Sequence, residues 1–225
     1  MDAAKQNPII EAYIGEYASG KSENAVNRAV ELVHKKRQVT LVDLDLVEPF
    51  YTLRPIKKQL EELGITVIAW DTKETLGLGE AGSVIKPEMI WVLKRSGDIV
   101  LDLGYGVDGA RVLNLLVGFK QNPFLKIIAV LNTTRPMTET VDDIIQFVKG
   151  LEPVDGLINN THLGDETTVQ LIQEGAKKVN AAAKKLNLPV IATSADERLR
   201  EQLGAYDQMG NPVRYLKRYM AQTFW

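Results

Sequence analysis

Gly15-Glu16-Tyr17-Ala18-Ser19-Gly20-Lys21-Ser22 is the stretch that decides how this chain folds. It fits the pattern G-x-x-x-x-G-K-[ST] at every fixed position. The apolar run 8–14 before it is typical of a strand, and residues 23–37 after it have helical periodicity. In this context the glycines let the backbone wrap a phosphate chain, and the loop amides and the helix N-terminus direct partial positive charge at it. The sequence therefore predicts a phosphate-binding loop, or P-loop.

Two side chains of this loop are expected to act on the nucleotide directly. Lys21 should reach the β- and γ-phosphates, and the Ser22 hydroxyl should ligate Mg²⁺. All eight residues of the motif are predicted to line the nucleotide site: Gly15, Glu16, Tyr17, Ala18, Ser19, Gly20, Lys21 and Ser22. The alternative, an ordinary glycine turn, does not account for the strand and the helix on either side.

Composition excludes several classes of protein. The chain has 225 residues, of which 45% are hydrophobic and 25% charged, with a net charge of −2, so nothing favours a nucleic-acid surface. It has no cysteine, and its two histidines, His34 and His162, are far apart, so we expect neither disulfides nor a nickel or iron site. The polar N-terminus lacks the apolar core of a signal peptide, and no apolar run approaches the ~18 residues of a membrane span. We expect a cytoplasmic protein.

Strands and helices alternate along the chain. Most predicted strands are continuous apolar runs, which suits strands buried on both faces. We expect strands at 8–14, 39–44, 65–70, 98–103, 126–131, 154–159 and 189–192, and helices at 20–36, 55–63, 87–95, 110–117, 138–149, 167–186 and 195–203. This order predicts an α/β fold: a doubly wound, mostly parallel seven-stranded sheet with helices on both faces. Residues 1–225 should form a single domain.

Aspartates end two of these strands, at the edge of the sheet where ligands collect. Asp43 and Asp102 at the tips of apolar strands are suited to hold a hydrated Mg²⁺, which prefers oxygen ligands and retains waters. Asp45 should point to the same side as Asp43 and face an attacking water. The alternatives are turn-capping aspartates and, for Asp45, a side chain turned to solvent. Asp98 only starts its strand and is no candidate.

Three features resemble the MinD/ParA group of P-loop ATPases: the P-loop, the Asp-x-Asp of Asp43 and Asp45, and Asp102-Leu103-Gly104 at the end of a later strand. Its wider class includes metallocentre-maturation ATPases and dethiobiotin synthetase. The resemblance runs from Ile9 to about Ala195 and implies the P-loop NTPase fold. It also implies Asp43 and Asp102 as Mg²⁺-side aspartates, Asp45 as the residue that positions the hydrolytic water, and Asn160 as the adenine contact.

One loop position departs from the MinD/ParA pattern. The group has a signature lysine after the first P-loop glycine, which crosses to the partner's phosphates in an ATP-sandwiched dimer. Here that position is Glu16. A carboxylate facing a triphosphate is repulsive, so we expect no dimer of this kind. Arg54 or Arg111 would supply positive charge instead, unless both are ordinary solvated arginines.

The base is predicted to be adenine. Guanine readers of the P-loop class carry Asn-Lys-x-Asp after a strand, and the nearest candidate here is Asn132-Thr133-Thr134-Arg135. Arg135 has donors only and cannot accept the protons of guanine. The alternative for Asn160 is a helix cap or turn residue.

Residues 212–225 are predicted to form a C-terminal helix with Val213, Leu216, Met220 and Phe224 near one face and basic residues opposite. Such a helix packs on the sheet domain or a partner, or lies in a membrane interface; core-facing amphipathic helices are the commoner kind.

These observations predict a Mg·ATP-binding ATPase that hydrolyses ATP to ADP and phosphate and thereby switches its interaction with a protein client. Two alternatives remain open. One is a small-molecule ligase or kinase similar to dethiobiotin synthetase, with the glycine-rich residues 71–86 holding the acceptor. The other is a non-hydrolysing ATP-binding adaptor, suggested by Glu16.

Overall fold

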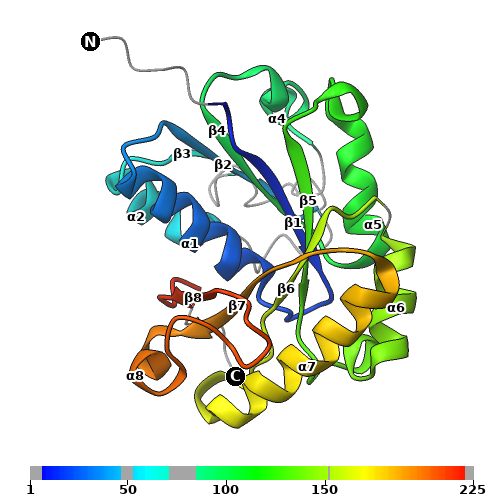
Figure 1. Ribbon diagram of the computed structural model, residues 1–225. Helices are drawn as coiled ribbons and strands as arrows, with labels where there is room; N and C mark the ends of the chain where they lie inside the picture. The colour runs from blue at the N-terminus through cyan, green and yellow to red at the C-terminus, as the bar shows by residue number, and fades with distance from the viewer. Residues whose placement is uncertain (1–6, 47–52, 71–84, 152, 221–225) are drawn as a thin grey trace.

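The computed structural model describes residues 7–46, 53–70, 85–151 and 153–220. Its centre is an eight-stranded sheet in the order β3-β2-β4-β1-β5-β6-β7-β8, in which every strand pair is parallel (Figure 1). The strands are β1 Ile10–Gly15, β2 Val39–Leu44, β3 Thr66–Ile68, β4 Asp98–Leu103, β5 Leu125–Leu131, β6 Gly156–Asn159, β7 Val190–Asp196 and β8 Val213–Leu216. The predicted α/β architecture is confirmed, with one strand more than expected.

Helices cover both faces of the sheet. They are α1 Lys21–His34, α2 Lys57–Glu62, α4 Pro87–Ile90, α5 Gly106–Arg111, α6 Val141–Gly150, α7 Val169–Leu186 and α8 Arg200–Leu203. Side chains alternate across β1: Ile10, Ala12 and Ile14 join the core beneath α4, α6 and α7, whereas Tyr13 joins the core beneath α1 and α2. Two cores on opposite faces make the sheet doubly wound, as Figure 1 shows.

Local signals set several helix boundaries. Helix α6 begins with a capping box in which the Thr140 and Asp143 side chains bond each other's backbone N–H. Helix α7 begins at the Thr168 hydroxyl, which accepts from Leu171 N, and ends at Asn187 in the left-handed conformation. The helix expected at 195–203 starts later than predicted, because β7 continues to Asp196.

The C-terminal helix predicted for residues 212–225 is wrong where the structure describes it. Val213–Leu216 is strand β8, paired in parallel with β7. A tight turn anchors it: Asp207 accepts hydrogen bonds from the amides of Met209 and Asn211 and from the hydroxyl of Thr193 on β7. Pairing with β7 gives the backbone of this β-branched and aromatic segment partners that outweigh its helical pattern. Residues 221–225 lie outside the described part.

The parallel arrangement positions the candidate site. Because all strands run in one direction, the loops that follow β1, β2, β4, β5, β6 and β7 meet at one edge of the sheet. Asp98 lies at the opposite edge, where its buried carboxylate accepts hydrogen bonds from Ile9 N and Arg37. The expectation that Asp98 only starts its strand is therefore confirmed. Within the described residues, no helix has the length and apolarity needed to cross a membrane.

Candidate functional site

The motif Gly15–Ser22 forms the turn between β1 and α1. Gly20 has φ 81°, and a Cβ there would lie 2.1 Å from Asn160 Nδ2. A Cβ on Gly15 would lie 2.3 Å from Ser19 Oγ and 2.5 Å from Val130 O. Both contacts are closer than a side-chain carbon tolerates, so the loop can take this shape only with glycine at its two fixed positions.

Asp43 and Asp102 lie side by side at the carboxyl ends of neighbouring strands. They are register partners in the β2–β4 pair, and Tyr13 of β1 is the other register partner of Asp102. Their side chains are buried, with Asp102 fully inaccessible. The structure therefore brings together, next to the P-loop, the two aspartates that the sequence pattern singled out.

Lys21 and Asp45 form an ion pair beside them. Lys21 Nζ lies 3.4 Å from Asp45 Oδ2, and both side chains are nearly buried. The amide of Asp45 donates to Asp43 Oδ1 at 3.2 Å, which holds the two aspartates in one turn. Asp45 thus faces the P-loop lysine, and the alternative in which it turns to solvent does not apply to this structure.

Asp102 is the most deeply buried carboxylate of the site. Neither of its carboxylate oxygens accepts a hydrogen bond from the part of the chain that the structure describes. Burial raises the pKa of Asp102 to about 7, and the negative charges of Asp43 and Asp45 add to this. The Lys21 ammonium and the nearby Ser22 hydroxyl act in the opposite direction.

These donors fit a magnesium ion. A buried carboxylate without a partner is costly unless a cation compensates it. Mg²⁺ keeps several waters and is bound through one or two carboxylates plus phosphate oxygens. Among the described residues, no group of three His, Cys, Asp or Glu side chains could hold a metal by itself.

Glu16 does not point where the sequence pattern led us to expect. Its carboxylate accepts from Met137 N and from Thr138 Oγ1, each at 3.3 Å, in the loop between β5 and α6. The Thr138 hydroxyl is shared, because it also lies 2.7 Å from Asn132 O. Glu16 therefore ties the P-loop to a neighbouring loop. Of the arginines expected to replace the lysine's charge, Arg111 forms an exposed pair with Asp108, which is the solvated alternative.

Asn160 lies beneath the P-loop. Its Nδ2 donates to Ser19 O at 2.7 Å, and the residue is only 6% exposed. Asn132, fully buried, donates from Nδ2 to His162 O at 3.2 Å and to Ala18 O at 3.5 Å. Sequence reasoning missed this role of Asn132, and it assigned Asn160 to the base. Asn132 and Asn160 directly follow β5 and β6, and this position in the sequence could have indicated that both side chains lie near the P-loop.

His162 packs against the same side of the loop. Burial lowers its pKa to about 4, helped by the positive charges of Arg135 and Arg218. The ring is therefore neutral at physiological pH. Gly164 N donates to Nδ1 at 3.4 Å, so Nε2 carries the remaining proton.

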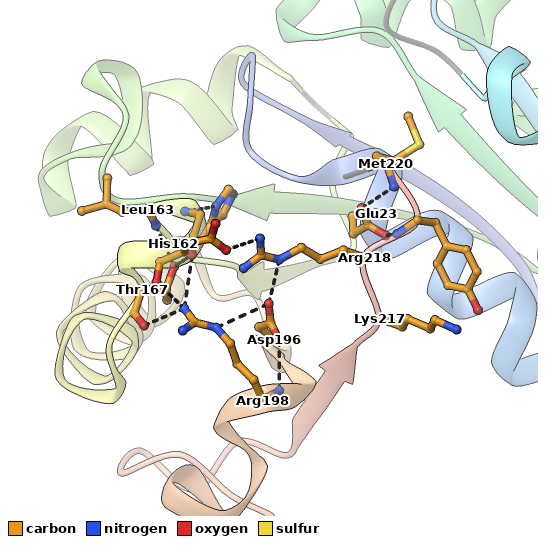
Figure 2. A network of polar contacts seen from close by, with 12 residues as sticks. Glu23, His162, Leu163, Thr167, Asp196, Arg198, Lys217, Arg218 and Met220 are labelled. Atoms are coloured by element: carbon orange, nitrogen blue, oxygen red, sulfur yellow. Dashed lines mark hydrogen bonds and ion pairs between the residues drawn. The ribbon is translucent and has the colours of Figure 1, made fainter. Parts of the chain in front are cut away.

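Two arginines organise the loop that follows β6 (Figure 2). Arg198 donates to the carbonyls of Asp165 and Thr167 at 2.7 and 3.1 Å. The Arg218 guanidinium donates to two carboxylates, that of Asp165 at 2.6 Å and that of Asp196 at 2.7 Å. These contacts join residues that are far apart in the sequence into one cluster at the carboxyl end of the sheet. We call this cluster the rim; it consists of Asp165, Thr167, Asp196, Arg198 and Arg218.

The rim continues to the start of α1. Glu23, next to Ser22, accepts from Tyr219 N at 2.6 Å and from Met220 N at 3.0 Å, as Figure 2 shows. Asn27, one turn further, exchanges two hydrogen bonds with the backbone of Lys217. Sequence reasoning missed these contacts, which join residues about 190 positions apart and have no local signature.

No protein-family model matches the chain, and no curated protein matches its sequence. Solved structures do match its fold. The signal recognition particle receptor FtsY from Elizabethkingia anophelis, in complex with GDP, is 16% identical with a TM-score of 0.56, covering 88% of this chain and 59% of that one.

Two further solved structures are similar. FtsY from Thermotoga maritima is 18% identical with a TM-score of 0.56, covering 86% of this chain and 63% of that one. FlhF complexed with GTP and Mg²⁺ is 14% identical with a TM-score of 0.52, covering 83% of this chain and 65% of that one. The chain spans about three-fifths of the length of these proteins. At these identities the likeness concerns the fold and does not distinguish the MinD/ParA group. The chain has the P-loop nucleoside triphosphatase fold.

Proposed function

We propose that this protein binds Mg·ATP and hydrolyses it to ADP and phosphate. One observation carries the proposal above the others: Lys21 and the unpartnered carboxylate of Asp102 lie together beside a loop shaped for phosphates. A metal–triphosphate complex needs a cationic group near its phosphates and an anionic group near its metal ion. Lys21 and Asp102 provide one group of each kind.

The P-loop supplies the binding of the phosphates. Its amides and the N-terminus of α1 attract anions, and the Lys21 ammonium reaches the β- and γ-phosphates. Ser22, Asp43 and Asp102 would hold Mg²⁺, which when bound neutralises phosphate charge and orients the triphosphate. Both aspartates are already buried at the strand ends, so little reorganisation is required of them.

The Lys21–Asp45 pair links binding to hydrolysis. A triphosphate carries more negative charge than Asp45 and competes for Lys21. Once Lys21 turns to the phosphates, the Asp45 carboxylate would orient a water toward the γ-phosphate. The same carboxylate would therefore serve first as the partner of the lysine and then as the partner of the water.

The position of the carboxylates also orients the nucleotide. Asp43 and Asp102 lie on the β2–β4 side of the P-loop, so the γ-phosphate belongs on that side. The nucleoside then extends toward the ends of β6 and β7, where Arg198 and Arg218 shape the rim. We propose adenine as the base because Arg135 has no acceptor for guanine. GTP is the second candidate, since similar folds were solved with GDP and GTP.

A MinD/ParA-like switch acting on a protein client remains our proposal for the biological output, with residues 1–225 as one domain. The segment after Asp45 that would move, and most of the glycine-rich residues 71–86 that a ligase would use, lie outside the described residues. The contacts of Glu16 remove one argument for a non-hydrolysing adaptor, because its carboxylate is bonded to Met137 and Thr138.

Replacing Lys21 tests the site directly. Lys21→Ala should weaken ATP binding at least about 100-fold, because a charge-assisted contact to the phosphates is lost, while the fold persists. Isothermal titration calorimetry measures the affinity. Lys126→Ala, an exposed lysine at the opposite edge of the sheet, is the matched control and should bind like wild type. ATP affinity of Lys21→Ala within a factor of two of wild type would contradict the assignment.

Adenine should be preferred over guanine. In a competition assay with labelled ATP and excess Mg²⁺, unlabelled ATP should displace the probe at lower concentration than GTP. The physical reason is the absence of an acceptor at Arg135. Displacement by GTP at an equal or lower concentration would sink the choice of adenine while leaving the triphosphate site intact.

Substitutions of Asp45 and Asp43 should have different effects, the first on hydrolysis and the second on Mg²⁺-dependent binding. Asp45→Ala should retain ATP affinity and lose 10²- to 10⁴-fold in turnover, roughly the effect of removing a positioned catalytic group. Asp43→Ala should weaken binding in Mg²⁺ and have little effect in EDTA. Phosphate release and calorimetry report the two quantities. Unchanged turnover of Asp45→Ala would remove this residue from the mechanism.

Asp102→Asn should stabilise the protein without metal and disable Mg²⁺-dependent binding. The raised pKa means that the folded state binds a proton between about pH 4 and 7 that the unfolded chain lacks. The cost of ionised Asp102 is thus full above pH 7 and fades as pH falls. In EDTA the variant should melt a few degrees higher at pH 8 and show a smaller gain at pH 5.

The control for this comparison is Asp142→Asn, an exposed aspartate on α6 that should leave the melting temperature unchanged at both pH values. A melting temperature of Asp102→Asn at or below that of wild type at pH 8 would show that ionised Asp102 carries no folding cost.

A further inference from the structure

We infer that Asn160 is a positioning residue of the P-loop, acting on the orientation of a loop peptide and not as a contact to the base. The inference rests on the proposed function only in naming phosphate as the group that the loop binds. Its basis is the contact between the Asn160 amide and the loop backbone.

The contact is close and buried. Asn160 Nδ2 lies 2.7 Å from Ser19 O, and a Cβ on Gly20 would lie 2.1 Å from the same nitrogen. Asn160 is therefore packed against the peptide that joins Ser19 to Gly20. It reaches this peptide only because residue 20 is glycine.

Holding that carbonyl fixes an amide. In a trans peptide the C=O and N–H of one unit point in opposite directions. Because Ser19 O is turned toward Asn160, the N–H of Gly20 is turned away from it, toward the open side of the loop. The next peptide is held in a similar way: Gly20 O accepts from both Asn24 N at 3.0 Å and Asn24 Nδ2 at 2.9 Å. Two asparagines thus aim two successive amides.

The support beneath Asn160 is rigid. Its own backbone N–H donates to Leu131 O at 2.7 Å, which joins the end of β6 to β5. Asn132, at the end of β5, supports the preceding carbonyl of Ala18 at 3.5 Å and is bonded in turn to both backbone groups of His162. The loop therefore rests on side chains that are themselves anchored to the central strands.

This arrangement matters because part of the loop is strained. Ala18 has φ 52°, a left-handed conformation that is unfavourable for a non-glycine residue. Such a conformation persists when the surrounding structure enforces it. Donors to the carbonyls of Ala18 and Ser19 provide that enforcement before any ligand arrives.

The test compares ligands with and without a base. Mg²⁺ complexes of ATP, GTP and inorganic tripolyphosphate are titrated into wild type, Asn160→Ala and Asn160→Asp. If Asn160 positions the loop, each variant should lose affinity by the same factor for every ligand that wild type binds. For Asn160→Ala this factor should be about tenfold. Asn160→Asp should lose more affinity than Asn160→Ala, because it places a carboxylate against the Ser19 carbonyl. Loss for ATP with unchanged tripolyphosphate binding would overturn the inference and make Asn160 a base contact.

Hydrogen exchange of the nucleotide-free protein gives a readout that does not depend on the proposed function. The amides of Ser19 and Asn24, both hydrogen-bonded within the loop, should exchange faster in Asn160→Ala, while those of β4 keep their wild-type rates. Unchanged rates at Ser19 and Asn24 would overturn the inference. If wild type binds none of the three ligands, the proposed function fails, yet the exchange rates still decide the role of Asn160.

Asn180→Ala is the matched control. Asn180 is an asparagine of α7 whose Nδ2 bonds to Ala176 O in its own helix at 3.0 Å. It should leave both the affinities and the loop exchange rates at wild-type values. If Asn160→Ala does not fold, as judged by circular dichroism, the near-isosteric Asn160→Asp carries both measurements.

Discussion

Parallel pairing of β1 with β4 on one side and β5 on the other is the constraint on which the site depends. It places the end of β1, where the P-loop begins, between the end of β4, which carries Asp102, and the end of β5, which leads to Asn132. Phosphate-binding backbone, candidate metal ligand and loop support thereby meet at one edge without any of them being close in sequence. The apolar cores on both faces of the sheet hold this register, because a slip by one residue would exchange the two faces of β1.

The same edge concentrates groups that oppose folding. Asp102 is a fully buried carboxylate with a raised pKa, Ala18 has a left-handed backbone, and His162 is half-buried in its neutral form. The ion pair between Lys21 and Asp45 compensates part of this cost. Binding of a triphosphate with its cation would bring further charges of both signs to these groups, so the proposed ligand should also stabilise the fold.

Short-range pattern was sufficient for the P-loop and the expected strands but not for every helix: residues 110–117, expected as one helix, are the end of α5 followed by a 3-10 turn. The glycine motif located the P-loop, continuous apolar runs located the strands, and strand-end aspartates located Asp43 and Asp102. It failed where partners are distant. Val213–Leu216 has a helical pattern of apolar residues but pairs with β7, and such pairing has no local sign. The Glu16 carboxylate would repel a phosphate if it faced one. The orientation of this side chain is set instead by hydrogen bonds from Met137 and Thr138, more than 120 residues away.

The central place of β1 has a consequence for biosynthesis. Residues 10–15 emerge from the ribosome before their two neighbouring strands, which begin at residues 98 and 125, and before the asparagine beneath the loop, residue 160. The glycine motif is therefore synthesised well before the elements that give it its shape. Pairings between segments so distant form slowly. The loop can therefore take the shape described here only after residue 160 has been synthesised.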